Sequence, residues 1–417
     1  MSYEVYFGPV RVGRLEAHRS RLEFRYTQDV AEAGAPALSV HLPTRSEPFG
    51  HDASDAYFAN LLPEDEYRRL VAKVVGQSDR NIAGLLGAIG GECAGAVSIW
   101  PAGEVPPAVP EYVPLDAEAV RRLLDGANVQ ERLAVVREAR LSLAGGMEKL
   151  GLRRQGGQWF RSRRGAPTTH ILKWPPLGYE DLPYNELFCH ALWQAVGIPV
   201  AEAEVLNTAT PVLVVRRFDR VALPDGGLRL IHQEDFAQAT GTHPASKYQA
   251  DGGPGFAACA AVLREFVAVP ARERELLMRW GVANFLTGNE DAHAKNLALL
   301  HEPQGTRLAP FYDIVCTQAY RGLRRAMAMS YGGEYRPAFI RTRHWERFAA
   351  ELGLPMRLVR SEAIELADAF ETSLPTVRAD LERQYGPHPV FERVQRAVKT
   401  QIGRAVAQLA GKAMDLT

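Results

Sequence analysis

Apolar and polar positions change their pattern along the chain, and residues 1–100 show short apolar runs around one longer periodic segment. Short runs bounded by polar residues and glycine are typical of strands, whereas the longer segment has the spacing of a helix. The predicted strands cover 5–7, 22–26 and 96–100, and the predicted helix covers 57–75. Residues 1–100 are therefore predicted to form an α+β module.

A proline-rich segment follows this module. Five prolines lie between Pro101 and Pro114. Because proline fixes φ and lacks a backbone N–H, the segment 101–114 is predicted to be an extended linker. A domain boundary is expected there.

The remaining chain changes from a strand-rich pattern over 115–232 to a mostly helical one over 233–417. One helix is predicted inside the first of these parts, between Pro183 and Gly197, which are residues typical of helix ends. The predicted strands are 169–173, 204–206, 212–215 and 228–231, and the predicted later helices are 256–267, 271–285, 346–352, 361–370 and 392–409. A β-rich lobe followed by a larger helical lobe is compatible with a nucleotide-binding enzyme.

Composition narrows the class of protein. A chain of 417 residues suggests roughly two to three domains, and 46% hydrophobic with 24% charged residues is typical of a soluble globular enzyme. Lys and Arg number 49, as do Asp and Glu, so no overall basic field would attract nucleic acid. The four cysteines form no C-x-x-C pair, and neither a signal peptide nor a membrane span is indicated. A cytoplasmic protein is expected.

The most informative polar residues lie in the motifs GNEDAHAKN (288–296) and LAPFYD (308–313). Asp291 and Asn296 are five residues apart, and Asp313 follows 17 residues after Asn296. Protein kinases use this Asp-to-Asn spacing, with a downstream aspartate, to deprotonate the acceptor hydroxyl and to bind Mg²⁺. The alternative is that Asp291 and His293 cap the preceding helix while Asn296 makes a turn.

A lysine and a glutamate strengthen the kinase interpretation. Lys173 ends a predicted strand, and Glu186 lies 13 residues later in the following helix. Kinases pair such residues to hold the α- and β-phosphates of ATP. The alternative is an ordinary surface lysine and a glutamate near a helix start.

Several other motifs allow two interpretations. SLAGGMEK (142–149) contains two glycines that would let backbone N–H groups approach a phosphate, or it is a simple turn. Two interpretations are open for the segment after the strand 212–215, which begins at Arg216. Its backbone groups form a hinge that hydrogen-bonds adenine, or the segment is a salt-bridged turn. The arginines between 153 and 164 indicate a solvated hairpin or a phosphate site. HQEDFAQ (232–238) and KYQADGGPG (247–255) read as a capped helix start and a glycine-rich turn without an assigned role.

Together these motifs resemble the HipA family of bacterial serine/threonine kinase toxins. The resemblance covers nearly the whole chain, through EVYFG, NLLPE and GAIGGECAGAV before residue 100 and SLAGGMEK, THILK, YNELF, RRFDR, HQEDFAQ, KYQADGGPG, GNEDAHAKN and LAPFYD after it. It implies an α+β, two-lobed protein-kinase-like fold with an extra N-terminal subdomain (1–100), the linker (101–114), an ATP-binding β-rich lobe (115–232) and a helical catalytic lobe (233–417).

The resemblance also implies roles for individual residues. Asp291 would be the proton acceptor, Asn296 and Asp313 would bind Mg²⁺, Ser142 would be autophosphorylated, and Glu186 would pair with Lys173. The implied ATP-binding residues are Ala144, Gly145, Gly146, Met147, Glu148, Lys149, Lys173, Arg216, Arg217, Phe218, Asp219, His293, Ala294, Lys295, Asn296, Tyr312 and Asp313. The glycine-rich loop departs from the family pattern Gly-Ala-Gln, which leaves the side-chain contacts of Met147 in doubt.

Partners follow from the resemblance as well. It implies a HipB-like helix-turn-helix antitoxin, contact with operator DNA only through that antitoxin, and an aminoacyl-tRNA synthetase as substrate, most often the glutamyl enzyme. Phosphorylation of that substrate would inhibit translation and favour growth arrest and persistence. Two other functions remain open: a corepressor acting with the antitoxin, and a small-molecule phosphotransferase, for which the module 1–100 would be unnecessary.

Overall fold

The computed structural model describes residues 1–19, 21–33, 37–125 and 128–410. The chain divides into two compact units. The first contains Met1–Glu180, Leu206–Ala245 and Leu300–Glu302, and the second contains Asp181–Val205, Ser246–Leu299 and Pro303–Thr417. Each unit is described by itself.

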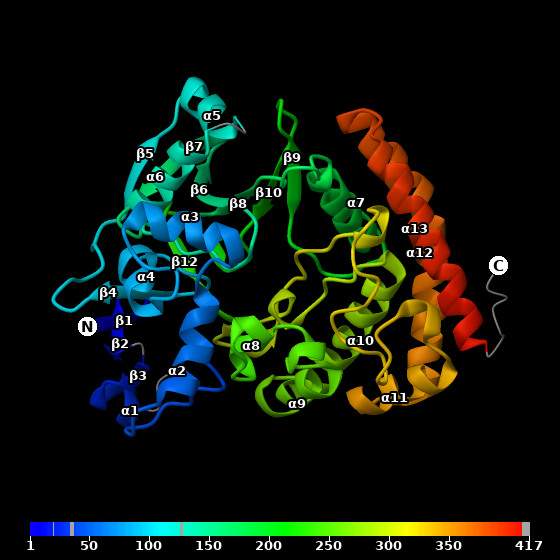
Figure 1. Ribbon diagram of the computed structural model, residues 1–417, viewed down its shortest axis with the longest axis horizontal. Helices are drawn as coiled ribbons and strands as arrows, with labels where there is room; N and C mark the ends of the chain where they lie inside the picture. The colour runs from blue at the N-terminus through cyan, green and yellow to red at the C-terminus, as the bar shows by residue number, and fades with distance from the viewer. Residues whose placement is uncertain (20, 34–36, 126–127, 411–417) are drawn as a thin grey trace. The chain divides into compact units, whose positions relative to one another are not determined.

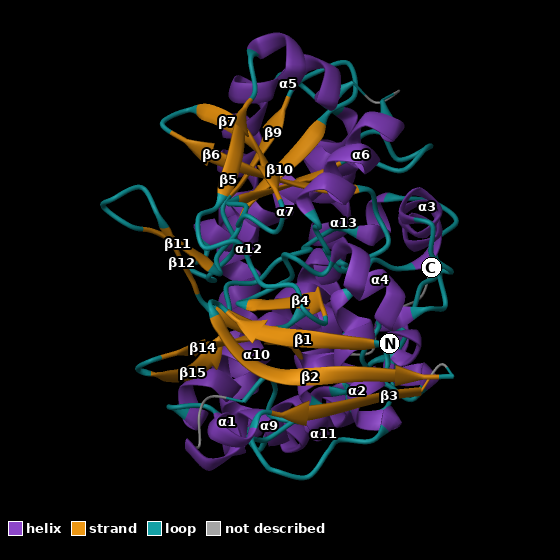
Figure 2. Ribbon diagram, turned by 90° about the vertical axis from the view of Figure 1, so that its left-hand side faces the viewer, coloured by secondary structure: helices purple, strands orange, loops and turns teal. Residues whose placement is uncertain are grey.

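The N-terminal part of the first unit is a four-stranded antiparallel sheet with helices. The strands β1 (Ser2–Phe7), β2 (Val10–His18), β3 (Arg21–Tyr26) and β4 (Val97–Pro101) have the order β3-β2-β1-β4, and Figure 2 shows them side by side. The helices are α1 (Gln28–Ala33), α2 (His51–Phe58), α3 (Asp65–Val75) and α4 (Ile82–Ile89). In β3, Leu22, Phe24 and Tyr26 alternate with exposed residues, so one face of the sheet contributes to the core.

The single helix predicted over 57–75 is wrong. α2 ends at Phe58, a short 3₁₀ turn covers Ala59–Leu61, and α3 begins only at Asp65. Leu62 is extended, with φ −90° and ψ 156°, because the ring of the following Pro63 disfavours helical geometry in the residue before it.

A second sheet of the first unit carries the β-rich part of the sequence. β5 (Glu111–Pro114), β7 (Gln158–Arg163), β6 (Lys149–Gln155), β8 (His170–Lys173) and β10 (Val212–Arg216) follow one another across it. The last residues of the predicted linker thus pair with β7, at the edge of the sheet, where proline is tolerated. The predicted hairpin is observed as β6 and β7, which turn at Gly156 and Gly157, both with positive φ, although Arg153 is buried rather than solvated.

The remaining elements of the first unit are short. They are α5 (Ala117–Leu124), α6 (Val129–Ala139), β11 (Arg220–Ala222), β12 (Leu228–Leu230), β13 (His232–Asp235) and α8 (Phe236–Ala239). The predicted capped helix start is confirmed, because Asp235 accepts the N–H of Gln238 while the Gln238 side chain accepts the N–H of Asp235.

The second unit is mainly helical. Its helices are α7 (Leu182–Ala195), α9 (Phe256–Phe266), α10 (Pro270–Thr287), α11 (Thr342–Leu352), α12 (Met356–Tyr385) and α13 (Pro389–Leu409), and its strands are β9 (Ala203–Leu206), β14 (Ala298–Glu302) and β15 (Gly305–Leu308). Residues 206 and 300–302 of these strands count with the first unit. α10 packs against α9, α12 and α13, and Figure 1 shows α12 and α13 side by side at the C-terminal end.

The length of α12 corrects the sequence prediction of a helix over 361–370. α12 has 30 residues and continues through Pro375. Neither this helix nor any other helix of the described residues combines the length and apolar character needed to cross a membrane.

Candidate active site

The candidate catalytic turn begins where α10 ends. Gly288 has φ +71°, and its N–H reaches the carbonyl groups of Asn284 and Phe285. The N–H of Asn289 also bonds to the Asn284 carbonyl, at 3.0 Å. These backbone bonds close the helix in a left-handed C-cap that glycine adopts without strain, and Asp291 takes no part in them.

The backbone of Asp291 is held by three hydrogen bonds. Its N–H donates to the Asn289 side chain at 3.1 Å, and its carbonyl accepts the His293 N–H at 2.9 Å. The same carbonyl accepts the Asn296 side-chain Nδ2–H at 3.0 Å. The spacing of five residues therefore lets the Asn296 side chain close the turn by donating to the Asp291 carbonyl.

Asp291 differs from its neighbours in exposure. All other residues from 281 to 299 are buried, whereas the Asp291 side chain is 49% exposed. A buried polar turn that leaves one carboxylate accessible presents that carboxylate to an incoming molecule.

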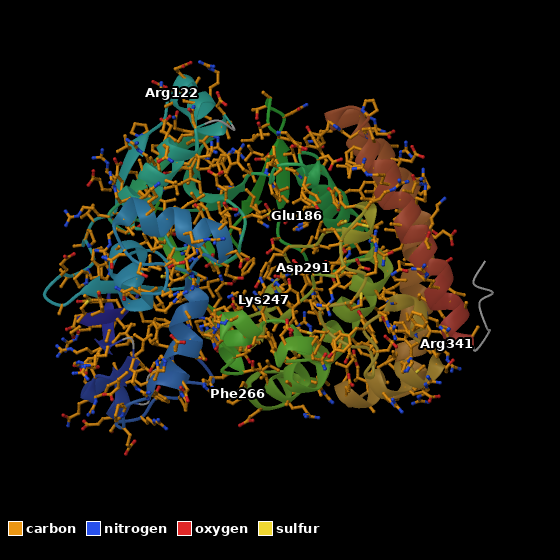
Figure 3. The ribbon with its side chains drawn as sticks, in the orientation of Figure 1. Arg122, Glu186, Lys247, Phe266, Asp291 and Arg341 are labelled. Atoms are coloured by element: carbon orange, nitrogen blue, oxygen red, sulfur yellow. The ribbon has the colours of Figure 1, made fainter. Side chains whose placement is uncertain are left out.

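Two aromatic residues approach the Asp291 carboxylate. The Tyr248 hydroxyl donates to Asp291 Oδ1 at 2.6 Å, and His293 Nε2 lies 4.0 Å from the same oxygen. Figure 3 places Asp291 near Lys247, the residue before Tyr248. Sequence reasoning missed Tyr248, although it lies in the KYQADGGPG motif.

Glu290, the residue before Asp291, is buried and joins the turn to a later segment. Its carboxylate accepts hydrogen bonds from Thr317 at 3.1 Å and Gln318 at 3.2 Å, and Arg325 lies 3.5 Å away. Burial raises the pKa of Glu290, although Arg325 and Thr317 act in the opposite direction. The Glu290 carboxylate is therefore buried and engaged within the protein, whereas the Asp291 carboxylate is half-exposed.

Asn296 and Asp313 offer the donor atoms that Mg²⁺ prefers, an amide oxygen and a carboxylate. The Tyr312 hydroxyl donates to the Lys295 carbonyl at 2.7 Å, which joins the two segments next to these residues. Asp313 has φ +54°, a conformation that costs a non-glycine residue energy and is often kept at functional sites. Among the described residues no group of three or more His, Cys, Asp or Glu could hold a metal alone. By donor chemistry alone these two residues suit a metal ion whose other ligands would be phosphate and water oxygens, and their role stays a prediction.

In the first unit, two buried lysines face one another. Lys149 on β6 and Lys173 on β8 are register partners, so both side chains lie on the same face of the sheet. Lys149 Nζ also donates to the Ala144 carbonyl at 2.7 Å, which holds the glycine-rich segment over this pair.

The glycine-rich segment is fixed to the N-terminal module. The Gly145 carbonyl accepts the Glu64 N–H at 3.0 Å, and the Ser142 N–H donates to the Glu92 carbonyl at 2.8 Å. The Ser142 side chain is fully buried, with its hydroxyl donating to the Leu61 carbonyl at 2.7 Å. Gly145 has φ +109°, which an L side chain would adopt only with strain.

Next to the predicted hinge at Arg216, three residues join Glu92 of the N-terminal module in a buried charge cluster. The three residues are Arg217, Asp219 and Arg220. Arg217 donates to Asp219 at 2.8 and 3.0 Å and to Glu92 at 3.0 Å, and Arg220 lies 3.2 Å from Glu92 and 3.0 Å from Asp219. The Arg217 and Asp219 side chains are thus engaged within the protein, whereas Arg216 is exposed. Binding of ATP by 216–219 stays a prediction that concerns the backbone.

The predicted pairing of Lys173 with Glu186 also stays a prediction, because these residues belong to different units. Within the second unit, Glu186 on α7 is buried and lies 3.8 Å from His190. The preceding Asn185 exchanges two hydrogen bonds with the backbone of Cys316, at 2.8 and 3.0 Å. The YNELF motif therefore supports the segment after Asp313.

Two family descriptions match the chain. The HipA N-terminal domain matches residues 3–100, and the HipA-like C-terminal domain matches residues 141–374, more than half of the 417 residues. The chain belongs to the HipA family. This membership confirms the resemblance seen in the sequence motifs.

Related proteins and a solved structure are also similar to this chain. Y4mE of Sinorhizobium fredii, which is named as a kinase, is 37% identical over 84% of this chain and 84% of its own length. The serine/threonine-protein kinase toxin HipA of Shewanella oneidensis is 29% identical over 90% of this chain and 89% of that protein. The structure of the Shewanella oneidensis toxin-antitoxin complex of HipA, HipB and operator DNA matches with TM-score 0.80 and 24% identity, covering 98% of this chain and 97% of that chain.

The structural match confirms the α+β, two-lobed kinase-like fold with a helical C-terminal part. As a member of this family, the chain is a HipA-like serine/threonine kinase.

Proposed function

We propose that this HipA-like kinase transfers the γ-phosphate of ATP to a serine hydroxyl of a protein, with Asp291 as the base. The main support is that Asp291 has the only side chain between residues 281 and 299 that is not buried. Its backbone is fixed by Asn289, His293 and Asn296, and a fixed backbone would help to hold the base within hydrogen-bond reach of the acceptor hydroxyl.

In the proposed reaction, the acceptor oxygen forms a bond to the γ-phosphorus as the bond to the β,γ-bridging oxygen breaks. ADP leaves with the electron pair of the broken bond, and Asp291 takes the proton of the acceptor hydroxyl. Little covalent chemistry is left to the protein, so the position of Asp291 is its main contribution.

ATP would be bound by the residues that the family resemblance assigns to it. The pair Lys149 and Lys173 supports this in the first unit, because two cationic side chains on one face of the sheet would donate charge-assisted hydrogen bonds to a phosphate. In the second unit Asn296 and Asp313 would hold Mg²⁺. When bound, the ion would neutralise charge that develops on the phosphates.

Ser142 is proposed as an autophosphorylation site. Its hydroxyl is fully buried and bonded to the Leu61 carbonyl, so the segment 142–146 would have to leave its present position before Ser142 could accept phosphate. A dianionic phosphate could not remain in this buried environment. Phosphorylation would therefore keep the glycine-rich segment away from the lysine pair.

The proposed partners come from the family. The Shewanella oneidensis relative was solved with HipB and operator DNA, and we propose a HipB-like antitoxin for this chain, with DNA contacted through the antitoxin. The proposed substrate is an aminoacyl-tRNA synthetase, and its phosphorylation would inhibit translation in the cytoplasm. A corepressor role with the antitoxin is compatible with this activity.

The first experiment incubates the protein with γ-³²P-labelled Mg²⁺-ATP and a panel of purified aminoacyl-tRNA synthetases. We expect Asp291→Asn to lower phosphate transfer roughly 10²- to 10⁴-fold, because the acceptor loses its base. Peptide mapping of the same incubation tests Ser142.

The matched control is Asp368→Asn, which changes an exposed aspartate on α12 and should leave transfer unchanged. Transfer by Asp291→Asn at the rate of the unmodified protein would refute the proposed role of Asp291.

A further inference from the structure

The motif KYQADGGPG, residues 247–255, has no role in the function proposed above, yet it forms a firmly held loop. The Tyr248 carbonyl accepts the N–H groups of Asp251 at 3.0 Å and of Gly253 at 2.9 Å. The next residue, Gln249, donates its N–H to the Ala328 carbonyl at 3.1 Å, and its side chain accepts the Ser330 N–H at 2.7 Å. The loop is thus bonded to itself and to a second segment.

The glycines of the motif are required by this geometry. A Cβ atom on Gly253 would stand 2.2 Å from the Ser246 carbonyl oxygen and 2.8 Å from that of Tyr248. Gly252 has φ +93° after the 3₁₀ turn Gln249–Asp251. A side chain at 253 would push apart the backbone on both sides of Tyr248, so the motif holds one backbone path for this tyrosine.

This backbone path directs the Tyr248 side chain to the turn that carries Asp291. The Tyr248 hydroxyl donates to Asp291 Oδ1 at 2.6 Å, which is a short hydrogen bond between oxygen atoms. The Tyr248 ring also meets the His293 ring edge to face, with centroids 5.2 Å apart and an interplanar angle of 84°. Both the hydroxyl and the ring of Tyr248 are therefore placed against the turn that carries Asp291.

We propose that Tyr248 is a positioning residue for phosphate transfer, an inference that rests on the proposed role of Asp291. By occupying Oδ1, the phenol fixes the rotation of a carboxylate that is otherwise half-exposed. The other oxygen, Oδ2, is then the atom that meets the acceptor hydroxyl. A freely rotating carboxylate would spend only part of its time in this orientation, and small displacements of a reacting group lower the rate strongly.

The test compares Tyr248→Phe with the unmodified protein. Phenylalanine keeps the ring and its contact with His293 but removes the donor to Oδ1. The rate measured is total ³²P leaving γ-labelled Mg²⁺-ATP, counted both as phosphoprotein and as inorganic phosphate. We expect kcat to fall roughly 10- to 100-fold, which corresponds to the free energy of one hydrogen bond to a charged group. The KM for ATP should change less than about twofold.

Tyr331→Phe is the matched control. Its hydroxyl donates to the Gly281 carbonyl at the same distance of 2.6 Å, in the same unit but in the aromatic core. This variant should lose some stability and keep its kcat. In the Asp291→Asn background, Tyr248→Phe should add no further loss, because both changes act through one carboxylate.

The outcomes separate two failures. If Asp291→Asn transfers phosphate normally, the proposed function fails. If Asp291→Asn is inactive while Tyr248→Phe keeps its full kcat, only the positioning role fails. An increase in kcat for Tyr248→Phe would also overturn the inference, because it would show that the phenol blocks the place of the acceptor.

Discussion

At the residue scale, two aspartates named by the sequence motifs have opposite surroundings. Asp291 is half-exposed, whereas Asp219 is 1% exposed and lies between the guanidinium groups of Arg217 and Arg220. Burial acts to raise the pKa of Asp219, but the two arginines and the N–H of Gly95 lower it to about 2. Asp219 is therefore a buried charge that holds the fold, whereas the Asp291 side chain is accessible to solvent.

This difference predicts how stability depends on pH. An unfolded aspartate has a pKa of about 3.9, so the ionised Asp219 contributes stability fully above about pH 4 and loses it as pH falls toward about 2. We expect Asp219→Asn to remove this part of the pH dependence. At neutral pH the variant should lose roughly 3 kcal/mol, because two buried arginines would keep only Glu92.

Urea unfolding at several pH values between about 3 and 7 measures the effect. Asp380→Asn, which alters an exposed aspartate 2.8 Å from Arg383, serves as the control and should change little. An unchanged dependence on pH for Asp219→Asn would contradict the charge assignment.

At the element scale, α12 shows how packing overrides a local signal. The buried residues Leu366, Phe370, Leu374, Val377 and Leu381 follow one another at intervals of three or four, so one apolar stripe runs past Pro375. A proline inside a helix costs about 3 kcal/mol, whereas each buried Leu, Phe or Val contributes about 1.5–3 kcal/mol. The burial of residues beyond Pro375 is sufficient to continue the helix.

Replacement of Pro375 should therefore stabilise the protein. Pro375 is exposed, so Pro375→Ala changes the backbone and little else. The restored N–H could bond to the Glu371 carbonyl, and we expect a gain of roughly 1–2 kcal/mol after allowing for a more flexible unfolded chain. Thermal unfolding measures it, with the exposed neighbour Thr376→Ala as the control. A lower unfolding temperature would mean that packing of α12 requires the proline.

At the scale of the whole molecule, the N-terminal module is part of the first compact unit rather than a separate body. The unit runs from Met1 to Glu180 without a division at 101–114, and Glu92 of the module contacts Arg217 and Arg220. The two positive charges of Arg217 and Arg220 are balanced by the carboxylates of Glu92 and Asp219. The four-part domain division from the sequence stays a proposal, but the module is bonded to the β-rich part by buried charges.

Loss of one of these charges should destabilise the first unit. Glu92→Gln keeps the size of the side chain, removes its charge and leaves Arg217 and Arg220 with Asp219 alone. We expect a loss of roughly 3 kcal/mol in denaturant unfolding. Glu104→Gln is the control, because Glu104 is 57% exposed in its pair with Arg140 and should contribute less than about 1 kcal/mol. Equal effects of the two changes would show that the cluster does not hold the module in place.

The sequence by itself determined the features that depend on neighbouring residues. The hairpin with Gly156 and Gly157, the capping box of Asp235 with Gln238 and the helices α7, α9, α10 and α13 followed from local patterns, because their hydrogen bonds join residues a few positions apart. The spacing of Asp291 and Asn296 is of this kind, since their contact closes one turn. The motifs also indicated the HipA family, which the family comparison confirmed.

Only the tertiary structure decided which distant side chains meet. It set Tyr248 against Asp291, placed Lys149 opposite Lys173, buried Asp219 with Glu92 and continued α12 through Pro375. Each outcome depends on packing between segments far apart in the chain, and burial strengthens electrostatic contacts beyond their value in water. A spacing rule cannot supply the register of two strands or the exposure of a carboxylate. These properties distinguish Asp291, which the fold leaves accessible, from Asp219, which it encloses.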